Sequence, residues 1–111
     1  MKIVKKLEDY EYKQIIDMKR EQFEEALSVS SMNIGQTENM RKFFSLQHDI
    51  MRQQVLALSK LLSSTEEKLD DETRSKAEDT IAQLFLIMFS LEYKATLLFN
   101  RTRELSGGLN N

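Results

Sequence analysis

The chain contains no proline, and its glycines lie only at positions 35, 107 and 108. Proline and glycine are the residues that most strongly interrupt helices and form turns. A chain of 111 residues that nearly lacks them has few points at which a long helix must end. Because 41% of its residues are hydrophobic and 31% are charged, the chain can also form a packed core. The sequence therefore predicts an all-α protein with long helices.

Apolar residues that recur at steps of three and four predict three antiparallel helices, at about residues 7–28, 37–63 and 71–105. A segment rich in Ser, Asn and Gly separates the first two helices, and an acidic stretch before residue 71 begins the third. These helices predict a single helical-bundle domain over residues 1–106. Residues 107–111 are expected to form a flexible tail, because Arg101 and Arg103 followed by two glycines are typical of a helix end.

The third predicted helix would be about 50 Å long at 1.5 Å per residue. A compact domain of this chain length has a diameter of only about 34 Å. We therefore expect an elongated bundle rather than a globule.

One stretch of the third helix is apolar on every side. Seven of the eight residues from 84 to 91 are hydrophobic, and a helix of this kind is normally buried all round. The other two helices can cover only two of its flanks. We expect a third flank formed by Phe85, Met88, Phe89 and Leu91 to be the interface of a homodimer or to bind a partner. Periodicity does not determine which of these residues faces which side.

Two alternatives remain open for this region. A bent first helix, or the connection through Met32 and Ile34, would close the third flank within a monomer. The second helix carries Gln47 and Gln54 along its apolar stripe, either at the edge of the stripe or as polar positions that set the register of a coiled coil.

The residues that carry catalysis or bind cofactors are scarce. The chain has no cysteine and one histidine, His48, which excludes disulfides, thiol catalysis and cysteine-containing zinc sites. No Glu lies three residues before His48, so the carboxylate and histidine pattern of di-iron bundles is missing. Glycine-rich phosphate loops and nucleophile elbows are also missing. We expect no catalytic residues, metal, cofactor or small-molecule substrate, and hence no enzyme.

Nucleic-acid binding is the main alternative function. The formal net charge is −2, but basic residues gather locally at the N-terminus and along the second helix. Phosphate affinity grows with the number of neutralised charges, so these clusters would have to meet on one face. The candidate contacts of a small dimeric DNA- or RNA-associated regulator are Lys5, Lys6, Arg41, Lys42 and Arg52.

The remaining chemistry is that of an apolar helical surface. The N-terminus has no hydrophobic signal region, and the longest apolar run is about half of the roughly twenty residues that cross a bilayer. We therefore expect a cytoplasmic protein without a membrane span. The sequence favours a protein-binding module, such as an adaptor, inhibitor, assembly chaperone or regulatory subunit, that recognises helices through apolar contact. A purely structural, self-assembling protein is a third possibility.

Overall fold

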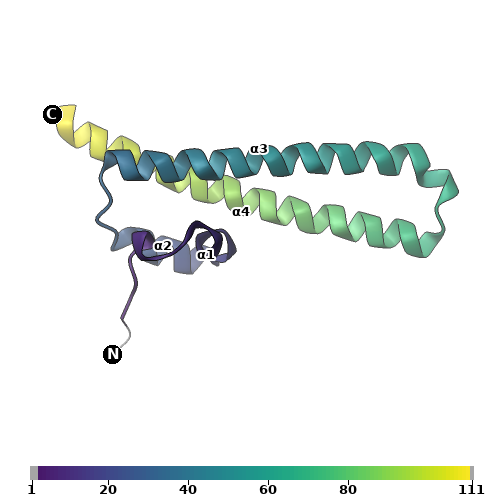
Figure 1. Ribbon diagram of the computed structural model, residues 1–111, viewed down its shortest axis with the longest axis horizontal. Coiled ribbons are helices and arrows are strands. Elements are labelled where there is room, and N and C mark those ends of the chain that lie inside the picture. The colour runs from purple at the N-terminus through teal and green to yellow at the C-terminus, as the bar shows by residue number, and fades with distance from the viewer. Residues whose placement is uncertain (1–2, 111) are drawn as a thin grey trace.

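The computed structural model describes residues 3–110, and every regular element in that range is a helix (Figure 1). The all-α prediction is therefore confirmed. The elements in chain order are η1 (Leu7–Asp9), α1 (Tyr12–Asp17), α2 (Arg20–Ser28), α3 (Ile34–Thr65), η2 (Glu66–Lys68) and α4 (Asp71–Asn110).

Helices α3 and α4 form one long antiparallel hairpin that dominates the shape (Figure 1). The molecule measures 60 × 37 × 18 Å, and its radius of gyration is 18.0 Å. A compact domain of this length would have a radius of gyration near 13 Å. The prediction of an elongated shape is thus confirmed.

The first predicted helix, residues 7–28, is not continuous. It is divided into η1, α1 and α2, and the chain turns at Met18, where ψ is 140°. In an unbroken helix the Ile16 carbonyl would accept the N–H group of Arg20. Here the Lys94 ammonium donates to that carbonyl at 2.7 Å instead. The break lets Ile15 of α1 and Phe23 of α2 both point into the core.

Side-chain caps determine where the two long helices begin. Helix α3 starts at Ile34, three residues before the predicted start, because Asn33 and Gln36 form a reciprocal capping pair at 2.8 and 3.0 Å. Helix α4 starts at Asp71 as predicted, after the Asp70 carboxylate accepts the Thr73 N–H group at 2.7 Å. Hydrogen bonds from Thr73 also lower the pKa of Asp70.

The end of α4 differs from the prediction. The helix continues past Leu105 and through both glycines to Asn110. A glycine that ends a helix normally takes a positive φ, and none of the described glycines does so. The predicted tail at residues 107–111 is therefore helical as far as Asn110, and Asn111 lies outside the described residues.

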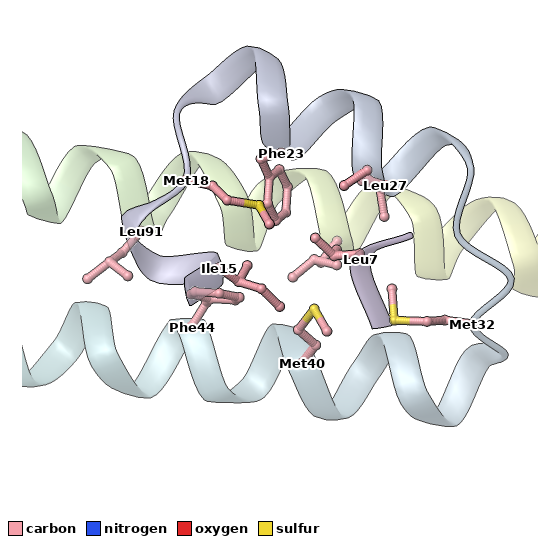
Figure 2. Packing of buried hydrophobic residues seen from close by; sticks show 11 residues of the cluster. Leu7, Ile15, Met18, Phe23, Leu27, Met32, Met40, Phe44 and Leu91 are labelled. Carbon is pink, nitrogen blue, oxygen red and sulfur yellow. The ribbon is translucent and has the colours of Figure 1, made fainter. Parts of the chain in front are cut away.

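The core lies at one end of the hairpin, where residues 3–33, here called the N-terminal segment, pack across both long helices (Figure 2). Three layers meet only in this proximal half, which comprises α3 before residue 50 and α4 after residue 90. The distal half comprises residues 50–65 of α3 and 71–90 of α4. The cluster contains Leu7, Ile15, Met18, Phe23, Ala26, Leu27, Met32, Met40, Phe44, Leu91 and Leu98.

Candidate protein-binding surface

Two cations of α4 hold the N-terminal segment in place. The Lys94 ammonium donates to the Ile16 carbonyl at the end of α1, and the Arg101 guanidinium donates to the Leu27 carbonyl at the end of α2 at 3.0 Å. Cations are favourable at helix C-termini, where unpaired carbonyls concentrate negative partial charge. Lys94 and Arg101 are seven residues apart, so they lie on one side of α4. Arg101 was predicted to lie in the last turn of a helix, whereas the role of Lys94 was not predicted.

Lys94 is a buried charged side chain, with 0% of its surface exposed. Desolvation lowers the pKa of its ammonium below 10.5, and the nearby Asp17 carboxylate opposes that shift. Its position, between the buried leucines Leu91 and Leu98 at helical spacing, is the sequence signal that would have identified it.

A second polar contact ties η1 to the connection before α3. The Glu8 carboxylate accepts hydrogen bonds from the Ser31 N–H group at 2.9 Å and the Ser31 hydroxyl at 2.8 Å. Desolvation raises the pKa of Glu8, but the hydrogen bonds outweigh it and lower the pKa from 4.5 to about 2. The Ser30 hydroxyl also accepts the Leu7 N–H group at 2.8 Å.

The distal half exposes an unusual number of large apolar side chains. In this part of the chain α3 and α4 contact one another along a single seam, and no other element among residues 3–110 covers them (Figure 1). Single exposed apolar residues are ordinary, whereas a contiguous set marks an interaction surface. The exposed residues are Ile50, Leu56, Leu58, Leu61, Phe85, Leu86, Ile87 and Phe89.

Helical spacing divides most of this surface into two faces. The seam positions of α4 follow steps of three and four through the half-buried residues Ala77, Ile81, Leu84 and Met88. Phe85 and Phe89 lie on one side of that seam, and their rings stack with centroids 6.1 Å apart. Ile87 lies on the opposite side, because two residues correspond to about 200° of rotation.

The first side is here called the phenylalanine face, and it consists of Leu56, Phe85 and Phe89. The second side is called the open face, and it consists of Ile50, Leu58, Leu61, Leu86 and Ile87. Leu86 forms its outer edge, because it lies opposite the seam and about 60° from Phe89 around the helix. The open face lies on the side of the hairpin that carries the N-terminal segment in the proximal half.

The predicted interface residues are thus placed differently from one another. Phe85 and Phe89 are exposed, at 38% and 56%, as the prediction requires. Met88 is half-buried in the seam with α3. Whether these residues form an interface stays a prediction.

Leu91 is a correction to the predicted set. It is only 2% exposed and lies in the core, close to the turn at Met18 (Figure 2). The N-terminal segment reaches this position because its first helix breaks at Met18 and folds back. Leu91 therefore stabilises the monomer and has no surface to offer a partner.

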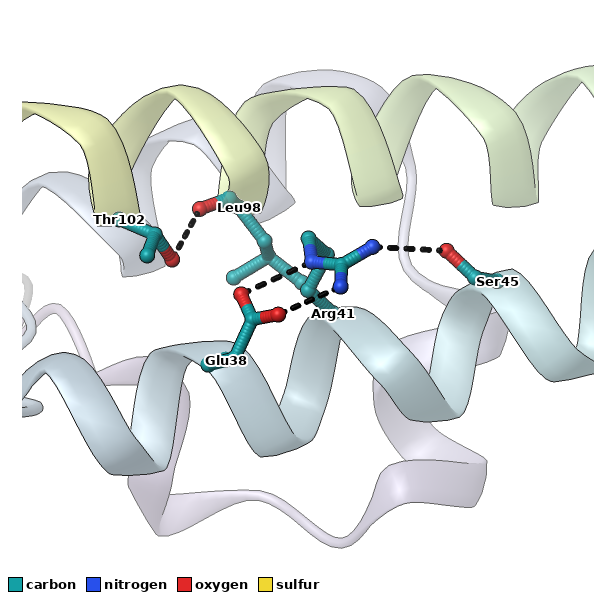
Figure 3. Close-up of polar contacts among 5 residues, drawn as sticks. All are labelled: Glu38, Arg41, Ser45, Leu98 and Thr102. Atoms are coloured by element: carbon teal, nitrogen blue, oxygen red, sulfur yellow. Dashed lines mark hydrogen bonds and ion pairs between the residues drawn. The ribbon is translucent and has the colours of Figure 1, made fainter.

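The five candidate nucleic-acid contacts lie on two parts of the chain, and those on α3 are spread along the helix, with Lys42 next to Arg41 and Arg52 further on. Arg41 is engaged by Glu38, whose Oε2 accepts its Nε at 2.9 Å (Figure 3). This pair lowers the pKa of Glu38 and raises that of Arg41. Arg52 lies eleven residues, or about 16 Å, further along α3. Lys5 and Lys6 belong to the N-terminal segment, where the Lys5 ammonium lies 5.7 Å from the centroid of the Tyr10 ring.

The histidine lies in a shallow depression of about 270 Å³ between α3 and α4. His48 Nε2 is 3.9 Å from a Glu92 carboxylate oxygen, and Nδ1 is 3.7 Å from an oxygen of Asp49. Within the described part of the chain, no three His, Asp or Glu side chains gather where they could hold a metal ion. This depression therefore shows no metal-binding geometry.

Helix α4 also meets a simple criterion for a membrane span. The stretch from Asp71 to Gly107 contains an 18-residue window with a mean hydropathy of 1.4, of which 17% is buried. The prediction of no membrane span was based on the shorter apolar stretch at residues 81–91. Few residues of this window are thus fully buried in the isolated chain.

Comparisons with protein families, with curated proteins and with solved structures found no match to this chain.

Proposed function

We propose that this protein is a non-enzymatic helical module that binds another protein chain through the distal half of its hairpin. The single observation that supports the proposal most is the concentration of exposed leucine, isoleucine and phenylalanine side chains in that half. An adaptor, inhibitor, assembly chaperone or regulatory subunit would act in this way.

The energetics of apolar burial support the proposal. Burying one large apolar side chain contributes roughly 1.5–3 kcal/mol when the side chain starts fully exposed. The side chains of the distal half are about half exposed, so several of them together supply the free energy of a specific complex. In the proximal half, the N-terminal segment folds over the hairpin and buries its apolar side chains within the chain itself.

A protein partner fits the surface better than a nucleic acid or a membrane does. Arg41 is already paired with Glu38, and Arg52 lies about 16 Å from it along α3. A membrane-spanning α4 would carry Glu92 and Lys94 in its apolar window. Charged residues in a bilayer are costly.

Site-specific photocrosslinking tests the proposal in the cells that produce the protein. A photoreactive phenylalanine analogue would replace Phe89 or Leu86 in the distal half, and Glu104 in the proximal half as the matched exposed control. We expect protein adducts from Phe89 or Leu86 and few from Glu104. Adducts to nucleic acid or lipid alone, or equal labelling from all three positions, would refute the proposal.

A further inference from the structure

The open face continues a surface that the protein already uses for helix packing. In the proximal half, Tyr12 contacts Phe43 with ring centroids 4.4 Å apart, and the Arg20 guanidinium lies 4.3 Å from the centroid of the Tyr93 ring. Residues seven positions apart share a side of a packed helix. Ile50 lies seven residues after Phe43, and Leu86 lies seven residues before Tyr93. The side that holds the N-terminal segment thus extends into the distal half without a covering element among the described residues.

The walls of the open face are also depleted of charge. Residues 80–91 of α4 and 53–59 of α3 include no Asp, Glu, Lys, Arg or His, although 31% of the whole chain is charged. Solvent-facing helix positions are normally rich in charge, and charge depletion is typical of the centre of an interface. Gln54 and Gln83 provide polar groups there without a net charge.

The two ends of the open face carry opposite charge. The hairpin tip, residues 66–72, contains five acidic residues and one basic residue. At the other end, the N-terminal segment turns at Met18, and residues 13–20 contain three basic residues and one acidic residue. Arg20 is already paired with Glu24 at 3.3 Å, so Lys13 and Lys19 are the cations that would meet the partner's acidic tip. Figure 2 shows Met18 and Leu91 together at the end of the core from which the distal half extends.

We propose that a second copy of this chain covers the open face, with the two distal halves packed antiparallel as a four-helix bundle. This inference rests on the proposed function and names its partner. Under two-fold symmetry, the acidic tip of each copy meets the basic turn at Met18 of the other copy. The N-terminal segments act as stops, because they block the proximal half and fix how far the two hairpins overlap.

The area of the open face suits a dimer. With roughly 200 Å² for a large side chain, the exposed fractions of its five apolar residues amount to about 500 Å² per chain. Two copies thus bury on the order of 1,000 Å² from these side chains alone. Specific interfaces bury about 1,200–2,000 Å² in total, and the flanking glutamines and charged ends provide the remainder.

Light scattering with one variant on each face tests the assignment. We expect the wild-type protein to have twice its chain mass of 13.0 kDa at micromolar concentration. Ile87→Asp changes a residue that is 42% exposed in the monomer, so the fold is retained while the dissociation constant rises at least about 100-fold. Phe89→Asp, a matched change on the phenylalanine face of the same helix, leaves the dimer intact. Circular dichroism confirms that both variants are folded.

Crosslinking tests the antiparallel register. The chain has no cysteine, so single-cysteine variants react at one position only. A short bis-maleimide is expected to join Glu67→Cys of one copy to Lys19→Cys of another when the two variants are mixed. Glu67→Cys alone is expected to give little dimer, because the two tips lie at opposite ends of the bundle. Efficient crosslinking of Glu67→Cys to itself would overturn the antiparallel arrangement.

The results separate this inference from the proposed function. A monomeric wild-type protein, or an Ile87→Asp variant that remains dimeric, overturns the pairing through the open face. If photocrosslinking still yields adducts of another protein, the proposed function stands and only the pairing of two copies is rejected. If neither self-association nor protein adducts are found, both fail.

Discussion

Replacing Lys94 with alanine should remove more stability than any other single lysine substitution in the described part of the chain. The side chain is 0% exposed, and its ammonium supplies the hydrogen bond that the Ile16 carbonyl receives at the break between α1 and α2. The variant therefore combines a cavity in the core with a carbonyl that has lost its donor.

The loss of stability in Lys94→Ala is the sum of two unfavourable effects, the cavity and the unpaired carbonyl, and one favourable effect, the removal of a desolvated charge. Truncating a buried side chain of this length to alanine costs about 2–5 kcal/mol, and a buried carbonyl left without a donor costs about 1–3 kcal/mol. Removing the ammonium also ends its desolvation, the effect that lowers the pKa of Lys94. We therefore expect the free energy of unfolding to fall by about 3 kcal/mol. Lys94→Met, which keeps the apolar stem, should lose less.

Urea denaturation followed by circular dichroism measures this difference, with Lys76→Ala as the control on the same helix. The Lys76 ammonium is exposed and pairs with Glu72 at 3.1 Å, a contact worth at most about 0.5 kcal/mol. Limited trypsin digestion should also cleave at Lys19 and Arg20 faster in Lys94→Ala, because α1 loses its anchor. Equal stability of the Lys94→Ala and Lys76→Ala variants would refute this reasoning.

The pH dependence provides an independent check on Lys94. Its pKa is lower in the folded protein than the ordinary 10.5 of the unfolded chain. Between these two values the unfolded chain binds more protons, so the stability of the wild-type protein relative to Lys94→Met should rise with pH. A stability difference that stays constant as pH rises through that range would show that the ammonium is not desolvated.

Three further predictions concern other parts of the fold. Because the pKa of Glu8 is about 2 in the folded protein and 4.5 ordinarily, the stability from its bonds to Ser31 is present above pH 4.5 and is lost as pH falls towards 2. Because the carboxylate is exposed, the free energy of unfolding should fall by only on the order of 1 kcal/mol over this pH range. Thermal unfolding measures this fall, which should be missing in Glu8→Gln. Leu91→Asp should unfold the monomer at a cost of more than about 4 kcal/mol, whereas Leu86→Asp should keep a helical circular-dichroism spectrum; the reverse result would exchange the core and surface assignments of these leucines. Asn33→Ala should cost about 1 kcal/mol by removing the cap of α3, and an unchanged melting temperature would show that this cap contributes nothing.

The sequence predicted the long helices well, because periodicity and caps are local. The start of the third predicted helix agrees with that of α4, and the second predicted helix lies within α3. The elongated shape followed from helix length alone. The apolar run at residues 84–91 also indicated that part of α4 lacks a cover within the chain, and Phe85 and Phe89 are indeed exposed.

The remaining features depend on contacts between residues distant in the chain. The break at Met18 was not predicted, because no proline or glycine lies near it and the Ile16 carbonyl finds its donor 78 residues away, in Lys94. The same break brings the N-terminal segment to Leu91, which local periodicity could not separate from its apolar neighbours. An apolar run that satisfies every helical register contains no information about which side is covered.

The anchors of the N-terminal segment have a consequence for how its sequence can vary. Lys94 and Arg101 both bind main-chain carbonyls, of Ile16 and Leu27, and every amino acid presents a carbonyl there. Substitutions at these two positions that preserve the local helices leave both hydrogen-bond acceptors in place. The polar part of the attachment therefore belongs to α4 and to the backbone path of the N-terminal segment, so α4 would retain its two cations while residues 16 and 27 vary among apolar side chains that fill the same core positions.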